Sequence, residues 1–196
     1  DLYSSDYVAS RYYKAYCDIK MKRPNSEMLM EDFMKDYPAT VYADMAKKLL
    51  AYLSFSSENY SLSLDYFETI DENAFKGDEK AEFLLKRAYC YMINNETEKA
   101  ANDFYAIDPF NKRYKPYANF YYANIAYRDG NFQTALELFL KLRTHKEFAS
   151  VVPYYIIQVY YMQKKFDKLI EMGPKYYNLI GGDRRYIVAR ILANAY

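Results

Sequence analysis

One stretch of the sequence decides the fold: YANIAYRDGNFQTALELF, residues 122–139. It reads as one helix, a turn at Asp129-Gly130-Asn131 and a second helix. Phe132 opens the second helix, and Ala135 and Phe139 follow three and seven residues later. Residues at these intervals lie on one face of a helix, so the stretch predicts two helices joined by a short turn.

The same frame recurs along the whole chain. Its anchor positions, each equivalent to Phe132, are Ser26, Tyr60, Thr97, Phe132 and Phe166, which are 34, 37, 35 and 34 residues apart. Three residues after each anchor stand Leu29, Ser63, Ala100, Ala135 and Leu169, and seven residues after it stand Phe33, Phe67, Phe104, Phe139 and Gly173. Nine residues before each anchor stand Cys17, Ala51, Ala88, Ala123 and Ile157. Four of these are small, which lets the two helices of a pair approach closely, and the shared register indicates an internal repeat.

The period and the order small, aromatic, small, aromatic resemble the tetratricopeptide repeat (TPR). The match covers roughly residues 10 to 180. It departs from the family's pattern in three ways: Trp is never used at the early aromatic position, Leu29 replaces the usual Ala in the first repeat, and Gly173 replaces an aromatic residue in the fifth. The resemblance implies an all-α fold, a TPR-like alpha-alpha superhelix that is a right-handed solenoid of antiparallel helix pairs. Within it, each pair buries its apolar face only against its neighbours.

This reading predicts a single solenoid over 1–196, which is expected to be a fragment of a longer chain. Its repeats are expected at 10–38, 40–75, 78–110, 113–147 and 150–180, with the start of a sixth helix pair at 184–196. The helices are expected at 6–22, 26–36, 40–56, 60–70, 78–93, 96–106, 113–129, 132–143, 150–163, 166–179 and 184–196.

Two details near the C-terminal end refine this layout. Pro174 is expected to kink or stop its helix because proline lacks a backbone donor. The last helix is expected to carry Ile187, Ile191 and Ala195 on an outer face that awaits a partner.

Composition excludes several classes of protein. The net charge is +1, with 27 basic and 26 acidic residues, whereas a nucleic-acid binder normally shows a basic excess or a basic face. The longest apolar runs, such as residues 151–155, are far shorter than a membrane span. We therefore predict no nucleic-acid partner and no membrane span in this segment.

The sequence contains no recognisable catalytic or metal-binding constellation. Its one histidine, His145, lies in a polar stretch between two helix pairs and is read as a loop residue. Cys17 and Cys90 stand far apart with no zinc-type spacing, and both are expected to be small buried helix residues. We predict no enzyme activity, no catalytic residues, no metal and no cofactor.

Two short phrases, Tyr37-Pro38 and Val152-Pro153-Tyr154-Tyr155, are similar to those of bacterial cell-envelope TPR proteins. That similarity implies a location in the bacterial periplasm or at the outer membrane, with the cytoplasm as the alternative.

In the TPR family the first helix of each pair lines the concave side of the solenoid. Carrying its outward positions over to this chain gives a candidate groove: Lys48, Tyr52, Lys86, Tyr89, Tyr117, Tyr121, Asn124, Arg128, Tyr155 and Gln158. Tyr and Arg are enriched at binding hot spots, so the expected function is a non-catalytic scaffold for a protein or peptide partner. The alternative is a glycan- or cell-wall-binding module, because tyrosine rings also stack on sugars. It is equally open that many of these rings pack between repeats and meet no ligand.

Overall fold

The computed structural model describes residues 4–196, and within that range every regular element is a helix. The elements are α1 (Ser5–Lys20), α2 (Ser26–Asp36), α3 (Val41–Ser56), α4 (Tyr60–Phe67), the 3-10 helix η1 (Glu72–Ala74), α5 (Gly77–Ile93), α6 (Thr97–Ala106), α7 (Lys115–Arg128), α8 (Phe132–Leu142), α9 (Val152–Met162), α10 (Phe166–Tyr177) and α11 (Asp183–Ala193). The eleven α-helices match the predicted ones, and η1 is a short addition that sequence reasoning did not anticipate.

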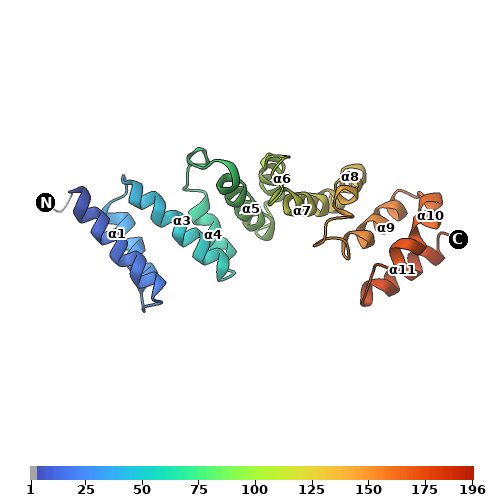
Figure 1. The fold of residues 1–196 in the computed structure, drawn as a ribbon, viewed down its shortest axis with the longest axis horizontal. Coiled ribbons are helices and arrows are strands. Elements are labelled where there is room, and N and C mark those ends of the chain that lie inside the picture. The colour runs from blue at the N-terminus through green and yellow to red at the C-terminus, as the bar shows by residue number, and fades with distance from the viewer. Residues whose placement is uncertain (1–3) are drawn as a thin grey trace. The chain divides into compact units, whose positions relative to one another are not determined.

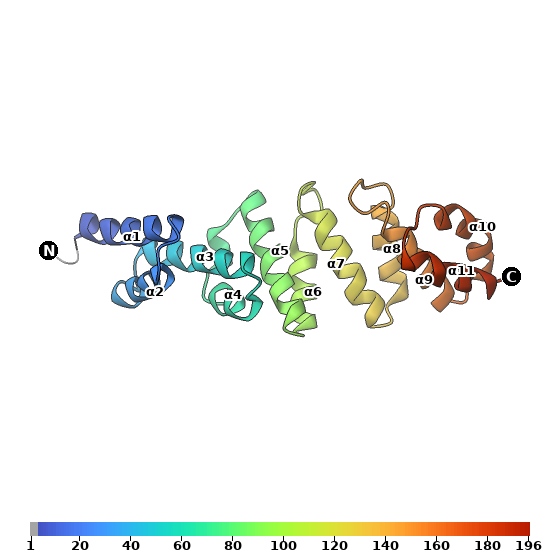
Figure 2. The same cartoon turned by 90° about the horizontal axis from the view of Figure 1, so that it is seen from below.

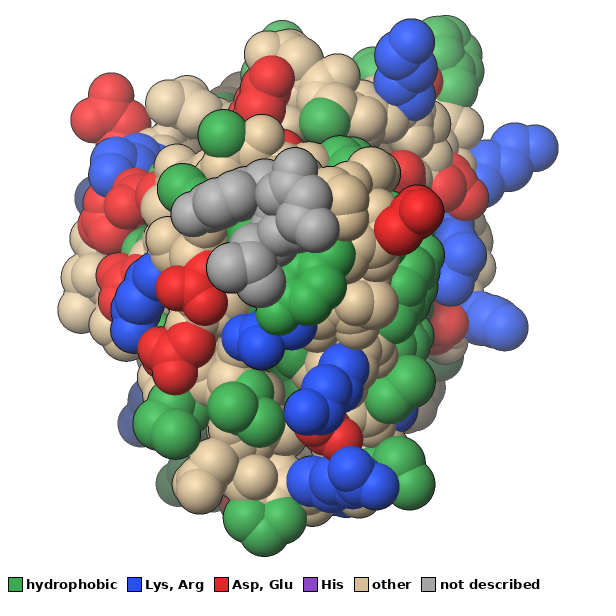
Figure 3. All heavy atoms as spheres, turned by 90° about the vertical axis from the view of Figure 1, so that its left-hand side faces the viewer, with side chains coloured by type: hydrophobic (Ala, Val, Ile, Leu, Met, Phe, Trp, Pro, Cys, Tyr) green, Lys and Arg blue, Asp and Glu red, His purple; other side chains and the backbone are tan. Residues whose placement is uncertain are grey.

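The chain forms two compact units. The first comprises Asp1–Phe75 and Tyr89–Glu96, and the second comprises Lys76–Ala88 and Thr97–Tyr196. Figures 1 and 2 show antiparallel pairs in each: α1 with α2 and α3 with α4 in the first, α7 with α8 and α9 with α10 in the second. On the face shown in Figure 3, Lys and Arg side chains are mixed with Asp and Glu. The predicted bounds of the repeats, and of a single solenoid, stay predictions.

In four of the five pairs the turn between the two helices is built in the same way. At the end of α3, the N–H of Asn59 donates to the carbonyl of Ser54 at 2.9 Å, and the N–H of Glu58 donates to that of Phe55 at 3.1 Å. Such a pair of hydrogen bonds is found where a helix ends at a residue with left-handed backbone conformation. The left-handed residues of the four three-residue turns are Glu58, Asn95, Gly130 and Lys164, with φ of 60°, 64°, 77° and 56°.

The first pair uses a longer turn, which shifts its frame. Residues 21–25 join α1 to α2, where the other pairs use three residues, so the small residue five positions before the end of the first helix is Ala15. Ala15 is buried and Cys17 is exposed, so the prediction that Cys17 is buried was wrong. In α2 the frame also moves by one position, because Met30 is fully buried and Leu29 is 46% exposed.

Close helix approach and a buried ring stabilise the helix pairs. Ala51, Ala88 and Ala123 have no exposed surface. The Ser63 hydroxyl of α4 donates to the backbone carbonyl of Ala51 in α3 at 2.8 Å, which a larger residue at either place would prevent. The ring seven residues after each of the first four anchors is buried: Phe33, Phe67, Phe104 and Phe139. Burying one such ring stabilises the fold by roughly 1.5–3 kcal/mol.

The C-terminal end of the second unit bears on two expectations. Pro174 was expected to kink or stop its helix; it lies within α10, which runs on to Tyr177, so it does not stop the helix, and the kink stays a prediction. Ile191 is buried in the core of this unit, and Ile187 and Ala195 pack against that core, so these residues do not form an outer face awaiting a partner. A side chain at Gly173 would collide with Leu192 of α11, which explains why no aromatic residue stands there.

Tyrosine hydroxyls connect successive helix pairs through glutamate. The bonds run from Tyr66 to Glu31 at 2.6 Å and from Tyr91 to Glu68 at 3.1 Å in the first unit, and from Tyr114 to Glu82 at 3.2 Å and from Tyr117 to Glu147 in the second. The ring of such a tyrosine packs in an apolar surface while its hydroxyl reaches a carboxylate. Burial, followed by the bond to Glu31, raises the pKa of Tyr66 well above its ordinary value.

Replacing Gly130 with alanine is expected to lower the free energy of unfolding by about 1 kcal/mol, because a Cβ disfavours the left-handed region. Gly181→Ala is the matched control: neither added Cβ would meet another atom within 4 Å, and only Gly130 has a left-handed φ. Urea denaturation of both variants measures the difference. Equal effects would show that backbone conformation does not limit this turn.

Replacing Tyr66 with phenylalanine is expected to cost about 1 kcal/mol at neutral pH, the net value of one hydrogen bond. Because the pKa of Tyr66 is raised in the folded protein, its stabilisation is complete below about pH 10 and is lost as the pH rises further. Urea midpoints measured across this range should therefore fall less steeply in the variant than in the wild type. Tyr13→Phe, at an exposed ring of the same unit, should leave both the midpoint and its pH dependence unchanged.

Candidate functional site

The residues predicted to line a groove are divided between the two units. Lys48, Tyr52 and Tyr89 belong to the first unit. The second unit holds Lys86, Tyr117, Tyr121, Asn124, Arg128, Tyr155 and Gln158. Each set is therefore described by itself.

The set in the first unit is engaged in packing. The Lys48 ammonium lies 4.9 Å from the ring centroid of Phe75 and 5.8 Å from that of Tyr52. The Tyr89 ring makes edge contacts with Phe55 and Tyr60, with centroids 5.7 and 5.2 Å apart. All three predicted residues thus contact aromatic rings of their own unit, Lys48 and Tyr52 in one group and Tyr89 in another.

In the second unit two of the predicted rings stack on the buried phenylalanines of the repeat. Tyr121 is stacked on Phe104 at 5.4 Å between centroids, and Tyr155 on Phe139 at 4.9 Å. Tyr155 also meets Phe120 edge-on at 5.9 Å, which places α9 beside α7. Tyr121 and Tyr155 therefore pack between repeats, which is the alternative that the sequence had left open for the groove tyrosines.

The predicted polar residues of the second unit remain nearer the surface. Arg128 is exposed and its guanidinium donates to the Thr97 hydroxyl at 3.5 Å. The Asn124 amide is half-buried and donates to the Phe120 carbonyl of its own helix at 2.7 Å. Gln158 is half-buried, and so is Lys86, whose ammonium lies 3.6 Å from the Glu82 carboxylate.

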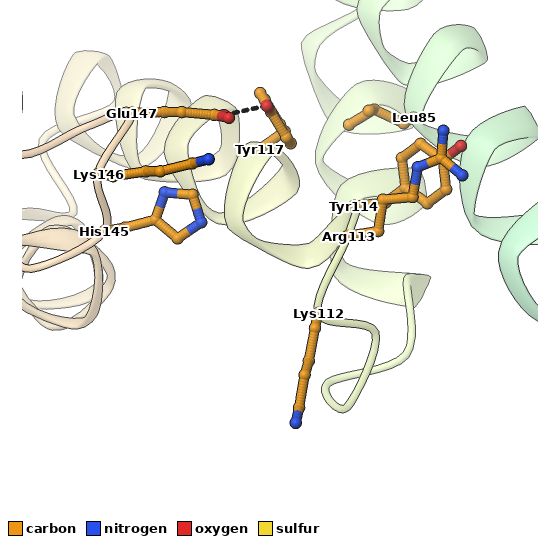
Figure 4. Close-up of a pocket in the computed structure, with 8 residues that line it drawn as sticks. All are labelled: Leu85, Lys112, Arg113, Tyr114, Tyr117, His145, Lys146 and Glu147. Carbon is orange, nitrogen blue, oxygen red and sulfur yellow. Dashed lines mark hydrogen bonds between the residues drawn. The ribbon is translucent and has the colours of Figure 1, made fainter.

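A pocket of about 460 Å³ opens at the N-terminal end of α7 (Figure 4). Its walls are Leu85 of α5, residues 112–114 before α7, Tyr117 of α7 and residues 145–147 after α8. Figure 4 shows His145 and Lys146 entering from one side, Leu85, Arg113 and Tyr114 on the other, and Lys112 pointing away. Tyr117 is the predicted groove residue that lines it.

Basic side chains dominate the charge of this pocket. Lys112, Arg113 and Lys146 are exposed, and among the described residues no ion pair neutralises them. The Glu147 carboxylate accepts a hydrogen bond from the Tyr117 hydroxyl, and this bond, with burial second, raises the pKa of Tyr117. Burial and then the charge of Glu82 raise the pKa of Tyr114, so both hydroxyls stay protonated at neutral pH. We call this the basic pocket.

A further cation, outside the lining of the basic pocket, holds the backbone beside it. Lys115, the first residue of α7, donates from its ammonium to the carbonyls of Tyr105 and Ile107 at 3.1 and 2.7 Å. It thereby satisfies carbonyls at the end of α6, as basic residues do at helix C-termini. Burial lowers the pKa of Lys115. This contact fixes the segment that carries Lys112, Arg113 and Tyr114.

Sequence reasoning missed most of the basic pocket. It considered only outward positions of the first helices, whereas Arg113 and Lys146 lie in the connections between one pair and the next. His145 does lie in such a connection, as predicted, and its ring is tilted against Phe148 with centroids 5.3 Å apart. The signal that could have found the site was the basic character of both connections, Lys112-Arg113 and His145-Lys146.

The described residues contain no cluster of three or more His, Cys, Asp or Glu side chains arranged to hold a metal ion. None of the described helices combines the length and the apolar character that a bilayer span requires. What the basic pocket can do chemically is bind a negatively charged group through Arg113 and Lys146 against an apolar wall.

The solved structures to which this chain is similar consist of tetratricopeptide or TPR-like repeats. A tetratricopeptide repeat protein from Parabacteroides merdae aligns with a TM-score of 0.66 and 17% identity, over 96% of this chain and 72% of that one. The fold is that of the tetratricopeptide repeat. TPR-like repeats of a putative kinesin light chain from Podosopora anserina align with a TM-score of 0.57 and 14% identity, over 78% and 84% of the two chains. A variant of the same repeats aligns with a TM-score of 0.56 and 12% identity, over 88% and 93%.

No family model matches the chain, and no curated protein matches it in sequence. The similarity to these solved structures confirms the predicted all-α TPR fold, although the sequence identity to them is low. In a repeat fold of this kind each helix pair contacts only its neighbouring pairs.

Replacing Tyr117 with phenylalanine is expected to loosen the segment 145–147, because it removes the hydroxyl that binds Glu147. A bond worth about 1 kcal/mol changes the population of an opened segment roughly fivefold. Trypsin cleavage after Lys146, followed by mass spectrometry, should accelerate by about that factor. Tyr122→Phe, a ring of the same helix that meets Tyr105, should leave this cleavage unchanged.

Proposed function

We propose that this TPR-fold protein is a non-catalytic interaction scaffold that binds an extended peptide or a helix of a partner protein along α7. The observation that carries the proposal is one stripe of α7, formed by Tyr117, Tyr121, Asn124 and Arg128. These residues are spaced by four, three and four positions, so they follow one face of the helix. With a rise of 1.5 Å per residue the stripe is about 16 Å long, the length of about five extended residues of a partner.

The N-terminal half of the stripe is aromatic and its C-terminal half is polar. Tyr117 borders the basic pocket, Tyr121 rests on the buried Phe104, and Arg128 is exposed. Rigid rings supply contact area at little entropic cost, and guanidinium and amide groups hydrogen-bond a peptide backbone. The stacking on Phe104 holds the Tyr121 ring in place before any partner arrives, which favours binding through preorganisation.

The predicted alternative, glycan binding, relies on tyrosine ring faces open to a sugar. One face of Tyr121 covers Phe104 and one face of Tyr155 covers Phe139. Each ring therefore has at most one face left for a sugar to stack on, and Tyr155 is also surrounded edge-on by Phe120, Tyr127 and Tyr154, so we prefer a protein partner. The envelope location expected from the sequence stays a prediction, and the partner proposed here belongs to that compartment.

The test is affinity capture from native cell-envelope extract with the wild type and an Asn124→Ala/Arg128→Ala variant. The matched control, Gln133→Ala/Lys141→Ala, also removes one amide and one cation, from exposed positions on α8. A protein that is retained by wild type and control and lost from the α7 variant supports the scaffold. Equal retention by all three, or capture of a polysaccharide alone, overturns the α7 site. The variants avoid Tyr121, because its removal would expose Phe104 and confuse binding with folding.

A further inference from the structure

We infer that the basic pocket binds carboxylate side chains, so that the partner segment of this scaffold is acidic. The inference rests on the proposed function and adds the chemistry of the partner. Its basis is the basic pocket of about 460 Å³, whose walls carry Arg113 and Lys146 from two different connections.

The cations of the pocket are available to a ligand. Within residues 4–196 neither Lys112 nor Lys146 forms an ion pair, and Arg113 uses only the face of its guanidinium, which lies 5.0 Å from the Tyr114 ring centroid. A guanidinium stacked in this way keeps its N–H edges free for a carboxylate. The one acidic wall residue, Glu147, accepts a hydrogen bond from the Tyr117 hydroxyl and keeps its charge, so the lining carries three cations against one anion.

Other hollows of the second unit differ in charge. A pocket of about 410 Å³ between α6 and α7 is lined by Glu98, Asp129 and uncharged residues. The chain as a whole has a net charge of only +1, so the three basic residues of the basic pocket are a local concentration. Complementary charge steers a partner and selects against the wrong one, which points to an acidic ligand here.

The shape of the pocket favours a chain of carboxylates over a single compact anion. Arg113 and Lys146 enter from opposite sides, and Lys112 points away from the space between them (Figure 4). Leu85 and the rings of Tyr114 and Tyr117 provide apolar walls that suit the methylene groups of glutamate side chains. Several acidic side chains along a peptide can meet separated cations in this way, whereas one phosphate would need convergent donors.

The test measures fluorescence anisotropy of a fluorescein-labelled hexaglutamate peptide at low ionic strength, where charge contacts are least screened. The full chain is compared with an Arg113→Gln/Lys146→Gln variant. The matched control is Lys175→Gln/Arg190→Gln, which removes one Lys and one Arg from exposed positions of the same unit outside the pocket. Thermal unfolding followed by circular dichroism confirms that each variant is folded.

The pocket variant should bind hexaglutamate about tenfold or more weakly, the effect of losing charge-assisted hydrogen bonds. The control should stay within about twofold, and a hexaglutamine probe should not bind the wild type. An equal loss in both variants, no binding by the wild type, or pocket-dependent binding only to inorganic phosphate or to phosphatidylglycerol vesicles would overturn the inference. If the pocket variant still captures the envelope partner that the Asn124→Ala/Arg128→Ala variant loses, the scaffold stands and the acidic-ligand inference fails.

Discussion

The fold depends on burying one aromatic ring in the second helix of each of the first four pairs. Phe33, Phe67, Phe104 and Phe139 are the residues that make this contact, and all are buried. In the second unit the following pair covers two of them with a tyrosine, since Tyr121 stacks on Phe104 and Tyr155 on Phe139. A helix pair alone would leave the ring in water, so each pair needs its neighbour, as in other repeat proteins.

This dependence explains the unusual composition. The chain has 26 Tyr, 12 Phe and no Trp. A tyrosine between pairs can pack its ring against a neighbour and still use its hydroxyl, and four tyrosines do so by donating to glutamates of an adjacent pair or its connection. Phenylalanine would supply the packing without the hydrogen bond. The tyrosine content therefore reflects how the repeats are joined as much as what they bind.

Function and stability compete for the same side chains on α7. Tyr121 is both a covering ring for Phe104 and part of the proposed binding stripe, whereas Arg128 is exposed and can change without opening the core. The connections between pairs combine a few buried anchors, such as Ile107 and Phe148, with exposed positions that can change without opening the core. A binding site built from Arg113 and Lys146 uses such exposed positions.

The sequence by itself determined the helices and their pairing. The spacing of Phe132, Ala135 and Phe139 recurs along the chain and required one buried face per helix, and helical periodicity is a local property, although the first pair is shifted from this frame. Three features were decided only by the tertiary structure. Cys17 is exposed because the first turn is longer, and Ile191 is buried because α11 packs against the core of its unit. Tyr155 is covered because its ring stacks on Phe139. Nor could periodicity place Arg113 opposite Lys146, since the residues of a pocket that are distant along the chain meet only when neighbouring pairs pack.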